Sequence, residues 1–469
     1  MDALFDDFSG AQKKCNGDLL SRTVTAGLTN DELRAIWKTC NAYDVKDVIK
    51  HGLQASDIGR SGAIPKEELK AWVDVYAVYW KAVGELLAVR DTSNDNRRAS
   101  QASWAKVYES WKELLSALIK GYNSSSFESW TIPCLYVTGK YLREFAIKAD
   151  AEKNSTQDNA AEPNFQDDFD PEAQQNHHLE DCARQLNRVF NTCLNDRAPL
   201  ENSRKWGIYH VINLLFKTYF KLNSASLSKN ILKALSAGRG DMPPLEAIPK
   251  SQQVTFKYYE GVLQFLEEDY VQAEKHLTEA WRMCHKDATK NKELILTYLV
   301  PCHLLTAHTL PSKKLLEPYP RLQKLFLPLS QHIRKGELHA FDLALQEGED
   351  EFVKRRIYLT LERGRDIALR NLLRKVFITG GFEEPKSEGA SPLRRTRVPI
   401  AEFAAGISLG CQETLDNDEV ECLLANMIYK VMTHLLTVFW TQNLMKGYIA
   451  RERGMVVLSK SGAFPGTGI

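Results

Sequence analysis

Paired cysteines are missing from this sequence. Its nine cysteines stand singly between Cys15 and Cys422, without a CxxC spacing, and the first residues do not read as a secretory leader. This usage predicts reduced, mostly buried thiols in a cytosolic or nuclear protein. Long hydrophobic runs are missing too, because charged or polar residues interrupt each candidate before it reaches the length of a membrane span.

Several catalytic and cofactor motifs are also missing. The sequence has no GxxxxGK phosphate loop, no GxGxxG after a predicted strand and no HExxH. Cys284, His285, Cys302, His303 and His308 offer metal-binding side chains, but structural zinc needs four ligands at short paired spacings. These five residues also fall on helices that are predicted to pack against one another. We therefore expect no metal, no cofactor and no enzymatic activity.

Helical hairpins are what the sequence does contain. Residues 258–284 read YYEGVLQFLEEDYVQAEKHLTEAWRMC, and their apolar side chains recur at helical spacing on both sides of the EED turn. Small residues among the aromatic ones, Gly261, Ala273 and Ala280, allow two helices to approach closely. One such pair cannot bury its own apolar face, so further pairs should stack on it. The predicted fold class is mainly α, a right-handed solenoid of TPR-like helical hairpins.

The rest of the chain divides by composition. Residues 1–148 are predicted to form an N-terminal helical region, in which residues 1–28 read as a frayed polar arm and helices begin at a cap near Thr29. Residues 149–178 hold almost no aliphatic side chains and many acids and amides, which predicts a disordered acidic insertion. Residues 179–379 carry the predicted run of hairpin repeats.

The pattern changes at Gly380. A loop rich in glycine, proline and charge is followed by two short helical patterns, and residues 447–460 then alternate around Arg453 and Gly454 as a two-stranded hairpin does. Two helices and a hairpin after a helical stack are typical of a winged helix. Residues 380–469 are therefore predicted to form a C-terminal winged-helix domain.

Together these segments resemble the PCI module, an array of helical hairpins that ends in a winged helix. The resemblance is strong over residues 182–464 and rests on NDRAPLENSRKWGIYHVINLLFKTYFKLN, VTFKYYEGVLQFLEEDYVQAEKHLTEA, KNKELILTYLVP, DEVECLLANMIY and KGYIARERGMVVLSK. Within the family, the chain is similar to the branch that contains the PCI subunit of the nuclear transcription and messenger-RNA export complex. The same branch contains the signalosome-associated subunit twelve of fungi.

The resemblance implies a non-catalytic scaffold that is located in the nucleus. It leaves open whether the protein is also found in the cytoplasm. Such a scaffold would pair through its winged helix with a second PCI protein, hold a small acidic disordered subunit and contact RNA or DNA in messenger-RNA export or splicing. No membrane partner is implied. The alternative is a purely structural subunit of signalosome or proteasome-lid type, without nucleic-acid contact.

One segment departs from the family pattern. In the family, the helix that ends in ANMIY passes almost directly into KGYI, whereas VMTHLLTVFWTQ, residues 431–442, intervenes in this chain. Three explanations of this extra segment are open: a longer helix, a lineage-specific insertion, or an exon-boundary error in the gene model. Sequencing the transcript decides whether these codons are real.

Charge is balanced over the whole chain, with 61 Lys and Arg against 60 Asp and Glu, but not locally. Residues 354–397 carry a net seven positive charges, and residues 430–460 add five further cations against Glu452 alone. Winged helices often present such a face to phosphates, whose neutralisation releases counterions. A solvated face or a protein interface is the other interpretation. The nucleic-acid candidates are Arg394, Arg395, Arg397, Lys430, Lys446, Arg451, Arg453 and Lys460.

Aromatic residues recur along the helix that starts near position 206. Because their spacing is helical, they are expected in the core or at a subunit interface rather than as platforms for bases. These residues are Trp206, Tyr209, Phe216, Tyr219 and Phe220. The resemblance implies that the small acidic subunit binds nearby, and the partner candidates are Lys205, Trp206, Lys217 and Lys221.

Overall fold

The structure is a computed structural model, and the residues that it describes are 2–55, 64–92, 102–124, 127–158, 176–383, 394–429, 444–460 and 462–467. The chain forms two compact units, Met1–Tyr259 and Glu260–Ile469. Their boundary falls within helix α12 (Lys250–Leu266), inside the range predicted as one run of repeats. Among the described helices, none combines the length and the apolar character that crossing a membrane requires.

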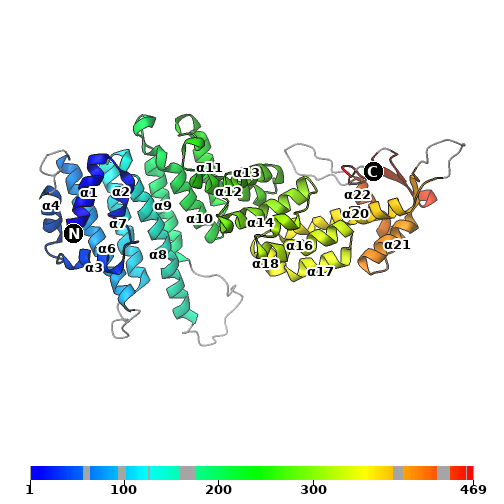
Figure 1. Cartoon of the computed structure of the whole chain (residues 1–469), viewed down its shortest axis with the longest axis horizontal. Helices are drawn as coiled ribbons and strands as arrows, with labels where there is room; N and C mark the ends of the chain where they lie inside the picture. Colours follow the sequence, from blue (N-terminus) through cyan, green and yellow to red (C-terminus); the bar gives the residue numbers. More distant parts are fainter. Residues whose placement is uncertain are drawn as a thin grey trace. The chain divides into compact units, whose positions relative to one another are not determined.

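The described part of the first unit consists of helices and turns (Figure 1). The helices are α1 (Asp2–Lys14), α2 (Gly17–Arg22), α3 (Asn30–Lys38), α4 (Val45–Ala55), α6 (Lys66–Thr92), α7 (Trp104–Ser124), α8 (Pro133–Asp158), α9 (His177–Leu194), α10 (Ile208–Lys221) and α11 (Leu227–Ala237). Short 3-10 turns lie between them: η1 (Ser129–Thr131), η2 (Leu200–Asn202), η3 (Arg204–Gly207), η4 (Arg239–Asp241) and η5 (Leu245–Ala247). Helix α6 packs on α7, α7 on α8, and α9 on both α8 and α10.

The first 28 residues are not a frayed arm, so that prediction is wrong. Helix α1 buries Leu4, Phe5 and Phe8. The ring of Phe8 meets those of Trp72 and Tyr76 on α6 edge-on, with centroids 5.5 and 5.7 Å apart. Buried aromatic pairs of this geometry stabilise a core. The N-terminal helices are therefore part of the first unit's core.

The predicted acidic insertion is too long at both ends. Helix α8 continues to Asp158, and α9 begins at His177, so residues 149–158 and 177–178 are helical. The carboxylate of Asp150 accepts hydrogen bonds from the backbone N–H groups of His178 and Leu179, both at 2.9 Å. This buried carboxylate satisfies two free N–H groups at the start of α9. The remainder of the predicted insertion lies outside the described residues.

The second unit consists of helices followed by a small sheet (Figure 1). Its helices after α12 are α13 (Tyr270–Met283), α14 (Thr289–Thr306), α15 (Lys313–Leu316), α16 (Pro320–Lys335), α17 (Leu338–Glu347), α18 (Glu349–Lys354), α19 (Tyr358–Glu362), α20 (Gly364–Thr379), α21 (Ile400–Cys411) and α22 (Asn417–Tyr429). The strands are β1 (Arg397–Pro399), β2 (Gly447–Ala450) and β3 (Met455–Leu458), with the 3-10 turn η6 (Arg451–Arg453) between β2 and β3.

The hairpin expected at residues 258–284 is confirmed as α12 and α13. Asp269 caps α13 by accepting a hydrogen bond from the backbone N–H of Gln272 at 3.1 Å. Gly261 faces Leu277 so closely that a β-carbon at position 261 would lie 2.7 Å from the Leu277 side chain. Ala273 and Ala280 are fully buried. The small residues therefore allow the close approach that the sequence predicts.

The winged helix is confirmed as well. Its antiparallel sheet has the order β1-β3-β2, and the sequence had indicated only the β2–β3 hairpin. Gly454, with φ 57°, takes the left-handed conformation at the turn into β3, which glycine adopts without strain. The mainly α fold of helical hairpins with a C-terminal winged helix is therefore the observed fold class. Lys430 and residues 431–442 lie outside the described residues.

Candidate nucleic-acid and partner interfaces

Two of the predicted nucleic-acid residues are engaged within the fold. The Arg394 guanidinium lies over the rings of Phe377 and Phe382, 5.6 and 4.8 Å from their centroids. Arg395 forms an ion pair with Glu402 of α21 at 2.9 Å. These contacts tie the segment before β1 to α20 and α21. Both cations therefore have structural partners, which local charge counting did not reveal.

Arg451, at the tip of the wing, is exposed but has acidic neighbours. Its side chain is 76 % exposed, yet it lies 3.8 Å from Asp418 and 3.5 Å from Glu421, both on α22. Exposed ion pairs of this kind contribute roughly 0–1 kcal/mol. Arg451 therefore connects the wing to α22 and has acids beside it that compete with any phosphate.

The other described candidates form a free set that we call the wing cations. Each is solvent-exposed, and none forms an ion pair with an acid of the described residues. The wing cations are Arg397, Lys446, Arg453 and Lys460. They lie around strand β3: Arg397 is opposite Val457, Arg453 precedes the strand at the turn, and Lys460 follows it. Within the described part of the winged helix, these four are the cations best placed to meet phosphates.

The partner candidates of the first unit behave differently from one another. Lys205 is buried, with its Nζ 3.9 Å from the carboxylate of Asp241. Trp206 is 37 % exposed and donates from its indole N–H to the carbonyl of Leu200 at 2.7 Å. Lys217 on α10 is exposed in part. Lys221, the last residue of α10, is exposed as well.

The aromatic stripe is mostly core, as its spacing predicts. Tyr209, Phe216 and Tyr219 are buried. Phe220 is half-buried, and its ring centroid lies 4.9 Å from that of Tyr259. The hydroxyl of Tyr219 accepts a hydrogen bond from the side-chain amide of Asn187 at 2.6 Å. The stripe thus holds α10 against α9 and α12. The lysines of α10, Lys217 and Lys221, lie on the side of the helix away from this packing.

A cluster that the sequence analysis missed lies between α8 and α10. Arg143 on α8 donates from Nη2 to the backbone carbonyl of Lys217 at 3.0 Å, and its buried Nε has no hydrogen-bond partner among the described residues. Burial lowers the pKa of Arg143. Loss of hydration lowers the pKa of Lys217, and repulsion from Arg143 and Lys140 lowers it further. We call these three residues, Lys140, Arg143 and Lys217, the α8/α10 cation cluster.

Among the described residues, no acid forms an ion pair with these three cations. The neighbouring carboxylate on α8, that of Glu144, is paired with Lys148 at 3.0 Å. The spacing of Lys140 and Arg143 already places them on one face of their helix. Only the fold brings Lys217 to the same place, from a helix more than 70 residues later in the sequence. An acidic segment bound here would relieve the mutual repulsion of the three cations.

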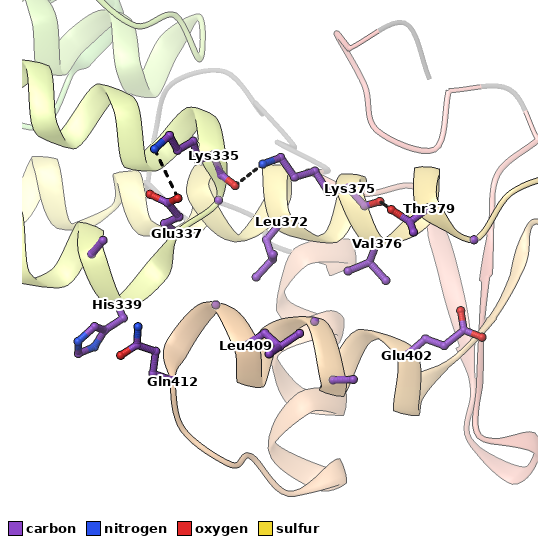
Figure 2. A pocket seen from close by; sticks show the side chains of 16 residues that line it. Lys335, Glu337, His339, Leu372, Lys375, Val376, Thr379, Glu402, Leu409 and Gln412 are labelled. Atoms are coloured by element: carbon purple, nitrogen blue, oxygen red, sulfur yellow. Dashed lines mark hydrogen bonds and ion pairs between the residues drawn. The ribbon is translucent and has the colours of Figure 1, made fainter.

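An open groove of about 760 Å³ lies in the second unit between α20 and α21, beside the turn from α16 to α17 (Figure 2). Leu372 and Val376 point into it from α20, and Leu409, 83 % exposed, lies across from them on α21. On its rim, Lys375 donates from Nζ to the carbonyl of Lys335 at 2.6 Å. An apolar floor with a polar rim is typical of a surface that receives a helix or peptide.

The sequence also contains one serine motif. Residues 406–410 read GISLG and match the GxSxG spacing of a serine nucleophile. All five residues lie inside α21, whereas the nucleophile of such enzymes sits on a sharp turn between a strand and a helix. The Ser408 hydroxyl instead accepts a hydrogen bond from the backbone N–H of Leu415 at 3.5 Å. Across the described ranges, no group of three or more His, Cys, Asp or Glu is placed to hold a metal ion.

Comparison with known proteins places the chain among named relatives. No family model matches it. It is 68 % identical to the Protein CSN12 homolog of Neurospora crassa over the full length of both chains. It is 33 % identical to the Protein CSN12 homolog of Schizosaccharomyces pombe over 88 % of each chain. It is also 30 % identical to PCI domain-containing protein 2 of Danio rerio, over 78 % of this chain and 80 % of that protein.

These relatives agree with the hairpin array and the C-terminal winged helix described above. The segments that carried the resemblance include α10, α22, β2 and β3, most of α12 and α13, and the greater part of α14. The chain therefore belongs to the PCI-domain family, in the branch of the fungal CSN12 homologues.

Proposed function

We propose that this chain is a non-catalytic PCI scaffold subunit of a nuclear complex that acts in messenger-RNA biogenesis, in transcription-coupled export or in splicing. Its winged helix contributes to RNA or DNA binding. The observation that carries the proposal is the set of wing cations, which are exposed and have no acidic partner among the described residues. Cations of this kind bind phosphates through counterion release, so the binding weakens with salt.

A second PCI protein would dock at the edge of the sheet. Within the described residues, strand β2 pairs with β3 on one side only, so its outer backbone N–H and C=O groups are not part of that sheet's ladder. Such an edge accepts another strand or chain readily. Tyr429, at the end of α22 in the same domain, is an exposed aromatic residue. This edge supports the proposal that the winged helix is also a subunit interface.

The small acidic subunit would bind in the first unit. The α8/α10 cation cluster offers three positive charges without a carboxylate among them, and Lys221 extends it toward the end of α10. Lys217 and Lys221 stay candidates for this contact. The burial of Lys205 and the hydrogen bond of Trp206 to Leu200 make those two residues weaker candidates.

The test is a salt series of RNA binding by the purified full-length chain. Arg397→Glu combined with Arg453→Glu reverses two wing cations, and Lys313→Glu combined with Lys314→Glu makes the same charge change at two exposed lysines of α15. We expect the wing variant to lose at least ten-fold in affinity at low salt and to show a shallower dependence of log affinity on log salt. The α15 variant should bind like the wild type.

One observation favours a second candidate, a purely structural subunit of signalosome or proteasome-lid type. Arg395 pairs with Glu402 and Arg451 with Glu421, so part of the predicted basic face serves the fold. Under this reading, the wild-type chain binds neither RNA nor DNA at low salt. The wing variant then loses only a protein partner.

A further inference from the structure

The sheet of the winged helix has one covered face and one open face. Side chains alternate across a strand, so Val398, Val456 and Leu458 share one face, and each is at most 3 % exposed. The side chains at the neighbouring strand positions point to the opposite face, as those of Arg397 and Val457 do. Their greater exposure shows that the helices of the domain cover only one side of the sheet.

The pairing register places an arginine and a tyrosine in one row on the open face. Arg397 of β1 lies opposite Val457 of β3, and Val457 lies opposite Tyr448 of β2. Directly opposed residues on neighbouring strands have β-carbons about 5 Å apart. Tyr448 is 56 % exposed, and Val457 between the two is half-buried. The row therefore presents an aromatic ring on one side and a guanidinium on the other.

A further cation, Lys446, borders this row. Lys446 precedes Tyr448 by two residues, and its carbonyl accepts a hydrogen bond from the N–H of Ser459 at 2.9 Å, so the strand pairing extends to it. By alternation its side chain leaves on the same face as Tyr448. Within residues 444–460, Glu452 at the turn is the single acid. The open face is therefore an apolar strip around Tyr448 with a positive border.

We propose that Tyr448 is a base-stacking platform and that Arg397 and Lys446 hold the flanking phosphates, which makes single-stranded nucleic acid the ligand class of this face. This inference rests on the proposed function and narrows it. In a duplex the faces of the bases are covered by their neighbours, whereas an unpaired base can leave the stack and lie on an exposed aromatic ring. Exposed tyrosine beside cations fits that ligand.

The stacking face and the proposed subunit edge are different surfaces of the same strand. A partner strand would pair with the backbone of β2 in the plane of the sheet, whereas the Tyr448 side chain stands roughly perpendicular to that plane. One strand can therefore serve both contacts. A bound PCI partner would lengthen the open face beyond Tyr448 rather than cover it.

The test compares one RNA in two forms, a labelled single strand of fifteen nucleotides and the same strand annealed to its complement. The full-length chain is used as wild type, Tyr448→Ala and Tyr448→Phe. Tyr43→Ala, at a fully exposed tyrosine of the first unit, is the matched control. We expect Tyr448→Ala to lower single-strand affinity about ten-fold and duplex affinity less than two-fold, because stacking acts on unpaired bases alone. Tyr448→Phe and Tyr43→Ala should keep wild-type affinities.

The outcomes separate this inference from the proposed function. If the wild type binds neither form, the proposed function fails and the inference fails with it. If the wild type binds both forms and Tyr448→Ala weakens them equally, or weakens neither, the stacking platform is refuted while nucleic-acid binding stands. If single-strand binding is unchanged and sedimentation shows that Tyr448→Ala alters the oligomeric state, the face is a self-association surface and the inference is overturned.

Discussion

The carboxylate of Asp196 binds Arg204 twice, accepting from the backbone N–H at 2.7 Å and from Nη2 at 3.0 Å. The hydroxyl of Ser203 donates to the same carboxylate at 2.9 Å. Arg204 also donates from Nη1 to the carbonyl of Tyr122 on α7 at 3.1 Å. Asp196 thereby fixes the connection between α9 and α10, and α10 carries Lys217 and Lys221 of the predicted acidic-partner surface.

Asp196→Ala should lower the free energy of unfolding at pH 7 by about 2–4 kcal/mol, because it leaves several buried donors without their acceptor. Burial alone would raise the pKa of Asp196, but the hydrogen bonds from Arg204 and Ser203 hold it well below its usual value. A lowered pKa stabilises the fold above the unfolded value near 4, and that contribution is lost as the pH falls further. Urea unfolding at pH 7 and pH 3 measures both effects.

Glu113→Ala is the control for this prediction. Glu113 forms an exposed ion pair with Lys81 at 2.8 Å on the neighbouring helix α6. Such a pair contributes roughly 0–1 kcal/mol. An Asp196→Ala variant no less stable than Glu113→Ala would show that the carboxylate does not hold this connection.

His210 should make the stability of the chain fall as the solution is acidified. Its ring stacks on Tyr136 with centroids 4.0 Å apart, and burial together with the nearby charge of Lys217 lowers its pKa to about 4. The unfolded chain takes up the proton near pH 6.5, so the contribution is full above that pH and is lost toward pH 4. His210→Phe should remove about 2 kcal/mol of this pH dependence while it keeps the stacking.

Urea titrations at pH 7, 5.5 and 4 measure the effect of His210. The exposed His285 supplies the control through His285→Phe, which should follow the wild-type curve. Equal pH dependence in wild type and His210→Phe would mean that the ring is protonated in the folded state as easily as in the unfolded state.

Gly261→Ala should destabilise the α12–α13 hairpin. The added methyl group would lie 2.7 Å from Cγ of Leu277 and 3.2 Å from its backbone nitrogen, so the helices must separate. Overpacking of this kind costs about 1–3 kcal/mol, which exceeds the gain of about 1 kcal/mol in helix propensity. Gly240→Ala, where a β-carbon meets nothing within 4 Å, is the matched control and should change stability by less than about 0.5 kcal/mol. A hairpin that tolerates both changes equally would contradict the close approach.

Local features of the fold were predictable from the sequence because the signal and its partner lie within a few residues. Thr29 caps α3 in a capping box with Glu32, as its position before an acidic turn suggests. The β2–β3 hairpin follows from alternation and from Gly454 at the turn. Strand β1 has only three residues and no alternation to detect, so it became visible only through its pairing with β3.

Contacts between residues far apart in the sequence determine the features that the sequence did not predict. The burial of Phe8 depends on Trp72, and the α8/α10 cation cluster depends on a contact between Arg143 and Lys217. For the candidate site, counting charges placed Arg395 and Arg397 in one class. The fold separates them, because Arg395 meets Glu402 while Arg397 stays exposed. A charge count finds the basic domain, and only three-dimensional pairing shows which cations are free.

The two arginines at the tip of the wing test this distinction directly. Arg451 and Arg453 are both exposed and lie two residues apart, but Arg451 is close to Asp418 and Glu421 while Arg453 has no acidic partner among the described residues. Arg453→Ala should lower RNA affinity about three- to five-fold and reduce the slope of log affinity against log salt by about 0.7, the value for one phosphate of a single strand.

Arg451→Ala should change the affinity and the slope by less than half as much, because the acids of α22 already neutralise part of its charge. Fluorescence anisotropy with a labelled RNA at four salt concentrations gives both quantities for the two variants. The pair is matched in residue type and location, so only the neighbouring acids differ. Equal losses would mean that the ion pairs of Arg451 open freely when RNA binds, and that exposure alone determines which cations meet phosphates.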